Sequence, residues 1–239
     1  MSEFNRSEVY VSEADGLRAY ITGVFTKMGI ALTITALVAY LGYATNLVIG
    51  LLASGLGTVL YFVLIAAQFG VCIALSAKLT SMKTSTATTL LYAYAALTGL
   101  TFSVLLYAYS AGTVFASFGF CAVLFFSCAV IGHTTNTDLS KFSGLLMGGL
   151  IALVITSVVS IFIPALRSSL LFSYIGIILF LGITAWDMQR IKQYYYGTSG
   201  GYGQIGQNLA VYGAFQLYLD FINIFLYVLR ILGRNSRRD

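Results

Sequence analysis

The sequence predicts an all-α integral membrane protein, because it is strongly apolar, sparsely charged and divided by its charges into helix-length segments. Of its 239 residues, 59% are hydrophobic and only 9% are charged, whereas a soluble domain carries about 25% charged residues. The mean hydropathy of +0.88 agrees with this composition. Open sheet edges are not tolerated in lipid, and the alternation typical of barrel strands is absent, so helices are the expected spanning elements.

The positions of the charged residues predict seven helices. Residues 28–77 and 84–137 contain no charged side chain, and each segment is long enough for two spanning helices of about 20 residues. Residues 142–166 and 168–186 each fit one helix, and the last apolar stretch, 205–229, fits a seventh.

Gly, Ser and Asn gather at 45–57 and 110–112, where we expect the turns of the two helical hairpins. Small residues at four-residue spacing predict close helix packing at two motifs, Gly144-xxx-Gly148 and Ala95-xxx-Gly99.

We expect one seven-helix transmembrane domain at 28–230, a polar amino-terminal tail at 1–27 and a basic carboxyl-terminal tail at 231–239. The net charge of +5 does not indicate nucleic-acid binding, because the cations crowd the carboxyl end or flank apolar runs. That placement fits anionic lipid, so the expected surroundings are a lipid bilayer.

Asp220 is the most informative residue, because it is an acid within the last apolar stretch. It precedes Arg230 by ten residues, which is about 15 Å along a helix. If Arg230 marks the interface, Asp220 lies near the middle of the bilayer, where a charge costs about 2.5–3.5 kcal/mol. Such a residue indicates a functional site; the structural alternative is a protonated Asp220 that bonds to Asn223 or to a tyrosine.

Asp187 is the second acid and ends the sixth expected helix. Arg190 follows three residues later on the same face, so a local ion pair is one explanation. Two carboxylates that lie close together in a low-dielectric interior resist simultaneous ionisation and can share one proton. Their oxygens are also ligands that Ca²⁺ prefers. Asp187 and Asp220 therefore indicate a proton sensor and gate with transient Ca²⁺ contact.

Enzymatic alternatives have weaker support. An intramembrane aspartate protease also needs two acids on adjacent helices, and the family of that kind has Tyr-Asp on one helix and Gly-x-Gly-Asp on the next. Here Trp186 precedes Asp187 and Tyr218 lies two residues before Asp220, so the glycine motif is missing. A serine hydrolase would have to use His133, without a nucleophile elbow. We therefore expect no enzyme activity.

No other motif indicates a cofactor. The three cysteines lie in apolar runs without a CxxC pair, which is typical of small core residues: Cys72, Cys121 and Cys128. The pattern Gly201-x-Gly203-x-x-Gly206 follows a membrane helix rather than a strand, so it predicts a flexible loop and not a dinucleotide site.

Four segments resemble the Bax inhibitor-1 (transmembrane Bax inhibitor motif) family, closest to its bacterial branch. They are, in order, ALTGLTFS at 96–103, GHTTNTDLSKF at 132–142, GITAWDMQRIK at 182–192 and LYLDFINIFLYVLRIL at 217–232. The last motif is the most specific. The resemblance implies a bundle in the inner membrane whose last helix is enclosed by the other six.

The resemblance also implies a pH-sensitive calcium leak, gated by an aspartate pair between helices six and seven, here Asp187 and Asp220. Some bacterial members have an Arg in the second helix that pairs with an acid. That helix has no charge here, and Gln68 is its most polar long side chain. We expect Gln68, Arg190 and Asn223 to be the supporting polar contacts.

Two functions are therefore expected. The first is a pH-gated Ca²⁺ channel or transporter that exchanges protons at the acid pair. The alternative is a membrane regulator that binds other proteins, because the same family includes bacterial members that look like modulators of a membrane-bound protease. In that case the polar tail at 1–27 is the contact element and the acids are structural.

Overall fold

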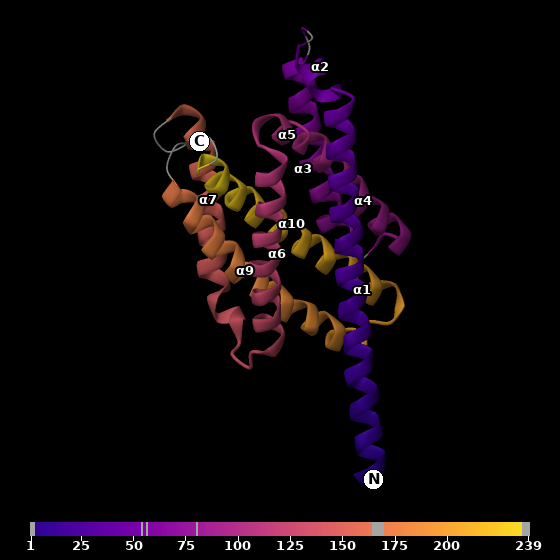
Figure 1. Ribbon diagram of the computed structural model, residues 1–239. Coiled ribbons are helices and arrows are strands. Elements are labelled where there is room, and N and C mark those ends of the chain that lie inside the picture. Colours follow the sequence, from indigo (N-terminus) through magenta and orange to yellow (C-terminus); the bar gives the residue numbers. More distant parts are fainter. Residues whose placement is uncertain (1–2, 54, 56, 80, 164–169, 236–239) are drawn as a thin grey trace. The chain divides into compact units, whose positions relative to one another are not determined.

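The computed structural model describes residues 3–53, 55, 57–79, 81–163 and 170–235, and this part of the chain is helical without a strand. Figure 1 shows the course of its helices. The elements are α1 (Glu3–Ala44), α2 (Leu47–Ala53), α3 (Gly57–Ala77), α4 (Thr84–Phe102), α5 (Leu105–Ala108), α6 (Ala111–Thr134), the 3-10 turn η1 (Leu139–Phe142), α7 (Ser143–Phe162), α9 (Leu170–Gly197) and α10 (Gly203–Asn235).

Among the described residues, seven helical segments are long and apolar enough to cross a membrane, which confirms the predicted all-α membrane fold. They are Glu13–Ala44, Val59–Ala77, Thr84–Ala108, Ala111–Thr134, Leu139–Ser160, Leu170–Gly197 and Gly203–Arg234. Half of the apolar window of the last segment is buried, against 6% for the second and fifth segments. The last helix is thus the most buried of the seven, as expected of an enclosed helix.

The predicted transmembrane domain contains two compact units. The first unit comprises residues 1–108 and 191–218, and the second comprises residues 109–190 and 219–239. Helices α9 and α10 are each divided between the units: residues 170–190 and 219–235 belong to the second unit, and residues 191–197 and 203–218 belong to the first. Both acids, Asp187 and Asp220, belong to the second unit.

The polar segment at 1–27 is continuous with the first span, because α1 runs from Glu3 to Ala44. Within the first unit, the hydroxyl group of Tyr195 donates to the carbonyl oxygen of Glu13 at 3.3 Å, so α1 contacts α9 from Glu13 onward. Residues 1–2 and 236–239 of the predicted tails lie outside the described residues, and residues 231–235 end α10.

The turns lie where the small residues predict them. The segment 45–57 contains the short helix α2; its residues 54 and 56 lie outside the described part. The chain turns again at Ser110, whose hydroxyl oxygen accepts a hydrogen bond from Thr113 N at 3.2 Å and caps α6.

The glycine-rich segment between α9 and α10 begins with a tight turn, at the place where we expected a loop. Gly201 and Gly203 have φ angles of 76° and 75°, which glycine adopts without strain. Gly200 N donates to the carbonyl oxygen of Tyr195 at 3.0 Å, so the turn closes directly on the end of α9.

Close helix packing occurs at only some of the small residues. A Cβ atom on Gly99 would lie 2.7 Å from the carbonyl oxygen of Thr35, so α1 and α4 approach closely in the first unit, as predicted. A Cβ atom on Gly144 or Gly148 would have no heavy atom of the described chain within 4 Å, so the prediction is wrong there. In the second unit Gly132 takes this role instead, with its Cα against the backbone of Ala185.

Candidate functional site

The two acids lie on neighbouring segments of the second unit, one on α9 and one on α10. Asp187 is 4% exposed and Asp220 is 3% exposed. They lie close enough for the charge of Asp187 to act on the carboxyl group of Asp220. The structure therefore buries both predicted residues and brings them together.

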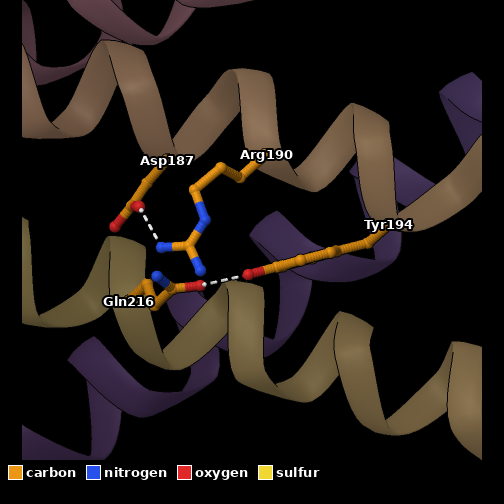
Figure 2. A network of polar contacts seen from close by, with 4 residues as sticks. All are labelled: Asp187, Arg190, Tyr194 and Gln216. Carbon is orange, nitrogen blue, oxygen red and sulfur yellow. Dashed lines mark hydrogen bonds and ion pairs between the residues drawn. The ribbon is translucent and has the colours of Figure 1, made fainter. Parts of the chain in front are cut away.

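Asp187 has a counter-ion on its own helix. Arg190 Nη1 lies 3.3 Å from Asp187 Oδ1, one helical turn away, as Figure 2 shows. The guanidinium carbon of Arg190 also lies 4.9 Å from the centre of the Trp186 ring, a distance at which a cation is attracted to the face of an aromatic ring. The predicted local Asp–Arg pair is thus present, and the ring of Trp186 stabilises the guanidinium group of Arg190.

Asp220 has different surroundings. The side chain of Thr184 lies near its carboxyl group, and the hydroxyl group of Thr184 donates to the carbonyl oxygen of Phe180 at 2.7 Å. Among the described residues, Asp220 Oδ2 has no hydrogen-bond partner. A buried polar atom without a partner costs about 1–3 kcal/mol, so the fold keeps this oxygen at a measurable expense of stability.

Aromatic rings from α6 pack around the acid on α10. Phe125 is fully buried, and its ring centre lies 5.5 Å from that of Phe221, the residue after Asp220. Phe118 packs on Phe221 as well, at 5.2 Å. Cys121 Sγ donates to the carbonyl oxygen of Phe221 at 3.4 Å. Asp220 is therefore followed directly by a residue packed in an aromatic cluster, and the low polarity of such a cluster strengthens electrostatic interactions nearby.

The three predicted supporting residues have separate roles. Arg190 pairs with Asp187. Gln68 donates to the carbonyl oxygen of Leu97 at 3.1 Å in the first unit, so its amide group joins α3 to α4. Asn223 donates to Leu219 O on its own helix at 2.7 Å.

The sequence reasoning missed Gln189, which holds the α6–α7 connection against α9. Its Oε1 accepts from Leu139 N at 2.8 Å, and its Nε2 donates to Thr137 O at 2.9 Å. The residue lies in the motif that carries Asp187, which is the signal that could have identified it.

The first unit has a polar contact between the same two helices. There the hydroxyl group of Tyr194 on α9 donates to Gln216 Oε1 on α10 at 3.4 Å (Figure 2).

The site does not provide a complete metal cage. In the described part of the chain, no three His, Cys, Asp or Glu side chains gather to hold an ion. Ca²⁺ takes six to eight oxygen ligands in a resident site. The two carboxylates fit a passing ion that keeps part of its water shell better than a stored one.

Comparison with known proteins agrees with this architecture. A family model described as "Inhibitor of apoptosis-promoting Bax1" matches residues 17–237. The chain is 36% identical over 226 residues to an uncharacterized protein of Rickettsia prowazekii, covering 94% of this chain and 92% of that protein. It is 35% identical over 233 residues to the inner membrane protein YbhL of Escherichia coli, covering 98% and 99%.

An uncharacterized membrane protein of Streptococcus pyogenes serotype M1 is 33% identical over 235 residues, covering 97% of this chain and 100% of that protein. The relatives match along nearly their whole length, and those of Escherichia coli and Streptococcus pyogenes are named as membrane proteins, so the chain is a multi-span protein of the inner membrane. With a family match at residues 17–237, and seven helices in the described part of the chain that are long and apolar enough to span a membrane, it belongs to the Bax inhibitor-1 family.

Proposed function

We propose that this protein is a pH-sensitive Ca²⁺ leak of the inner membrane, gated by Asp187 and Asp220. The observation that carries the proposal is the burial of two carboxyl groups on two helices, one of which is paired with the guanidinium group of Arg190. A membrane-buried acid is costly to keep unless it serves an ion or proton pathway.

The gate works through the repulsion between the two acids. When the pair holds a proton, the two carboxyl groups carry at most one negative charge, which Arg190 balances, and α9 and α10 stay together. When the proton leaves, two like charges face each other in a dry interior, and the helices separate. The flux of Ca²⁺ therefore rises with pH.

Ca²⁺ suits the open site because it is a hard cation that prefers carboxylate oxygens. Two carboxylates supply few of the ligands that a resident ion needs, so the ion binds briefly and leaves. The function is transport without an enzymatic step, and it requires no cofactor besides the transported ion.

The test is Ca²⁺ entry into dye-loaded liposomes that contain the purified protein, measured at pH 6 and pH 8. We expect wild-type flux to rise with pH. The double variant Asp187→Asn, Asp220→Asn keeps the shape of both side chains but removes their charge, so its flux should no longer respond to pH.

Asp138→Asn is the matched control, because Asp138 is exposed and caps η1 by accepting from Ser140 N at 3.0 Å. Asparagine caps a helix as well as aspartate does, so this variant should respond to pH like the wild type. A double variant that keeps the full pH response would contradict the gate.

A second candidate is a regulator that binds another membrane protein, such as a membrane-bound protease. Helix α1 favours it, because the helix begins at Glu3, ten residues before the candidate span Glu13–Ala44. Deleting residues 2–12 removes this polar helical start while keeping the Tyr195 contact at Glu13. Loss of partner binding in the deletion, with normal function of the double Asn variant, would favour the regulator.

A further inference from the structure

Tyr227 of α10 lies against α9 in the second unit, on a glycine between two phenylalanines. A Cβ atom on Gly176 would lie 2.5 Å from Tyr227 Cε2, so the ring takes the place that a side chain at this position would fill. The ring centre of Tyr227 lies 6.2 Å from that of Phe180 and 6.4 Å from that of Phe172, within the range of direct aromatic contact. We call these four residues the aromatic layer.

The aromatic layer and the acid pair occupy matched positions on the two helices. Phe180 precedes Asp187 by seven residues on α9, and Tyr227 follows Asp220 by seven residues on α10. Seven residues are two helical turns, about 10 Å along the axis, and they return to nearly the same helix face. The second-unit parts of α9 and α10 therefore meet at two levels, one at the acid pair and one at the aromatic layer.

The aromatic layer is an apolar contact between the two helices. None of its residues is charged, Phe180 and Gly176 are buried, and Tyr227 and Phe172 are half-buried. Glycine lets the ring approach the backbone of α9 directly. An apolar constriction closes an ion path because water, and therefore an ion with its water shell, does not enter it.

We propose that the aromatic layer is a second closure of the ion path, in series with the acid pair, and that the ring of Tyr227 on Gly176 seals it. The proposal rests on the proposed function and deepens it. The acids make the path respond to pH, whereas the aromatic layer keeps water from reaching them along α9 and α10. An ion passes only when both levels are open.

A packing role alone makes a different prediction. If Tyr227 only held α9 to α10, its loss would lower stability without admitting water between the two levels. Thr184 marks that space, because it is fully buried and lies four residues after Phe180 and three before Asp187 on α9. A thiol at position 184 therefore reports whether the aromatic layer is closed.

The experiment measures how fast a charged, membrane-impermeant thiosulfonate labels Thr184→Cys in nanodiscs at pH 6. Alanine replaces the three native cysteines in this parent protein, so that only the new thiol reacts: Cys72, Cys121 and Cys128. At pH 6 the acid pair is closed, so the measured route is the one past the aromatic layer. We expect Tyr227→Ala to raise the labelling rate by about tenfold, a change of about 1.4 kcal/mol in the barrier.

Two further substitutions separate the ring from the rest of the side chain. Tyr227→Phe restores the ring on the glycine, so its labelling rate should return to that of the parent protein. Gly176→Ala displaces the ring with a methyl group, so labelling should become faster, as in Tyr227→Ala.

Tyr174→Ala is the matched control, because Tyr174 also lies on α9 but is 50% exposed and belongs to neither level. Its labelling rate should equal that of the parent protein. A thermal unfolding transition in detergent checks that each variant is folded. Tyr227→Leu, which lacks the ring but keeps an apolar side chain, replaces any variant that is not, and it should also be labelled faster than the parent protein.

Ca²⁺ flux in liposomes, with the native cysteines and Thr184 in place, tests the series arrangement. At pH 8 the acid pair is open and the aromatic layer limits the flux, so Tyr227→Ala should raise it by about tenfold. At pH 6 the acid pair stays closed, so the flux of the variant should remain as low as that of wild type. High flux at both pH values would overturn the series arrangement.

The two measurements separate failure of this inference from failure of the proposed function. If wild type carries no Ca²⁺ at either pH, the leak is wrong, but faster labelling in Tyr227→Ala still supports a seal against water. Equal labelling of the folded Tyr227→Ala variant and the parent protein would overturn the seal, whatever the flux.

Discussion

The two units differ in how they treat their buried polar side chains. In the first unit these groups are bonded within the unit: the hydroxyl group of Tyr218 lies 2.7 Å from Thr35 Oγ1. The amide of Asn208 donates to Leu79 O at 2.7 Å, and its oxygen accepts from Thr84 Oγ1 at 2.8 Å. Helix α10 thereby fixes the turn between α3 and α4.

In the second unit several buried polar atoms have no hydrogen-bond partner among the described residues. They are Asp220 Oδ2, Trp186 Nε1 and Ser173 Oγ, and the described part of the first unit has no such atom. Each atom of this kind costs about 1–3 kcal/mol. A fold that bonds the described buried polar side chains of the first unit and leaves these atoms of the second unit without partners keeps the second unit ready for other partners.

The comparison assigns a role to each unit. The first unit is a fixed frame, whose polar groups have one set of partners. The second unit holds the groups that can exchange a proton or meet a cation. Four substitutions test this division, from the largest expected effect to the smallest.

Gly132→Ala should have the largest effect. The two units differ in polar bonding, but both depend on close backbone packing, and Gly132 is a point of such packing between α6 and α9. The new methyl group would overlap the backbone of Ala185 on α9, next to Trp186. We expect the free energy of unfolding to fall by about 3 kcal/mol, measured by steric trapping in bicelles. Gly148→Ala is the control, because it meets no described atom within 4 Å, and its stability should match wild type. Equal effects of the two substitutions would contradict this packing.

Asn208→Ala should lower stability without changing the gate. The substitution leaves Leu79 O and the hydroxyl group of Thr84 without their partner in a buried place, which costs about 2–3 kcal/mol. The same substitution at Asn223, on the same helix, removes only a bond to Leu219 O and should cost under about 0.5 kcal/mol. A shifted flux midpoint in Asn208→Ala would mean that the frame takes part in gating.

Arg190→Gln should do the reverse, with a large effect on the pH profile and a small one on stability. Without the guanidinium group, ionisation of Asp187 gains no counter-charge, so the flux should rise only at a pH about one unit higher. The side chain of Arg190 is 30% exposed, so solvent screens the pair and the free energy of unfolding should fall by less than about 1 kcal/mol.

Tryptophan fluorescence reports on this variant directly, because Trp186 is the one tryptophan of the chain. Its ring lies 4.9 Å from the guanidinium carbon, so its emission should change in Arg190→Gln. Lys192→Gln removes a positive charge from the same helix and should leave both the emission and the flux midpoint unchanged. A midpoint of Arg190→Gln equal to wild type would show that Asp187 does not titrate as part of the gate.

Most of the fold could be predicted from the spacing of charges, because a charged side chain in lipid is costly and each uncharged segment therefore had to hold helices. The division into two units could not be predicted. It depends on which faces of α9 and α10 meet their neighbours, and their apolar residues look alike in sequence. The packing at Gly132 rather than at Gly144 and Gly148 depends on the same contacts.

Only the ionisable residues of the candidate site could be predicted, because charged side chains are rare and conspicuous in an apolar sequence. Asp187 and Asp220 are visible as acids within helices, and Arg190 as a cation one turn from an acid. Gln189 is a common polar residue at a helix end, and its role depends on bonds to the α6–α7 connection that only the fold brings within reach. Gln68 was expected near the acids as a substitute for a charge, but its amide group bonds within the first unit.

Tyr218→Phe should have the smallest effect, and it tests the boundary between the units. Tyr218 ends the first unit and lies two residues before Asp220, yet its hydroxyl group bonds to Thr35 on α1. Loss of that bond should lower the free energy of unfolding by about 1 kcal/mol, and a double-mutant cycle with Thr35→Val should assign this loss to the pair. Because the hydroxyl group belongs to the frame, the flux midpoint should stay at its wild-type pH. A shifted midpoint would place Tyr218 in the gate and would end the division between a fixed and a responsive unit.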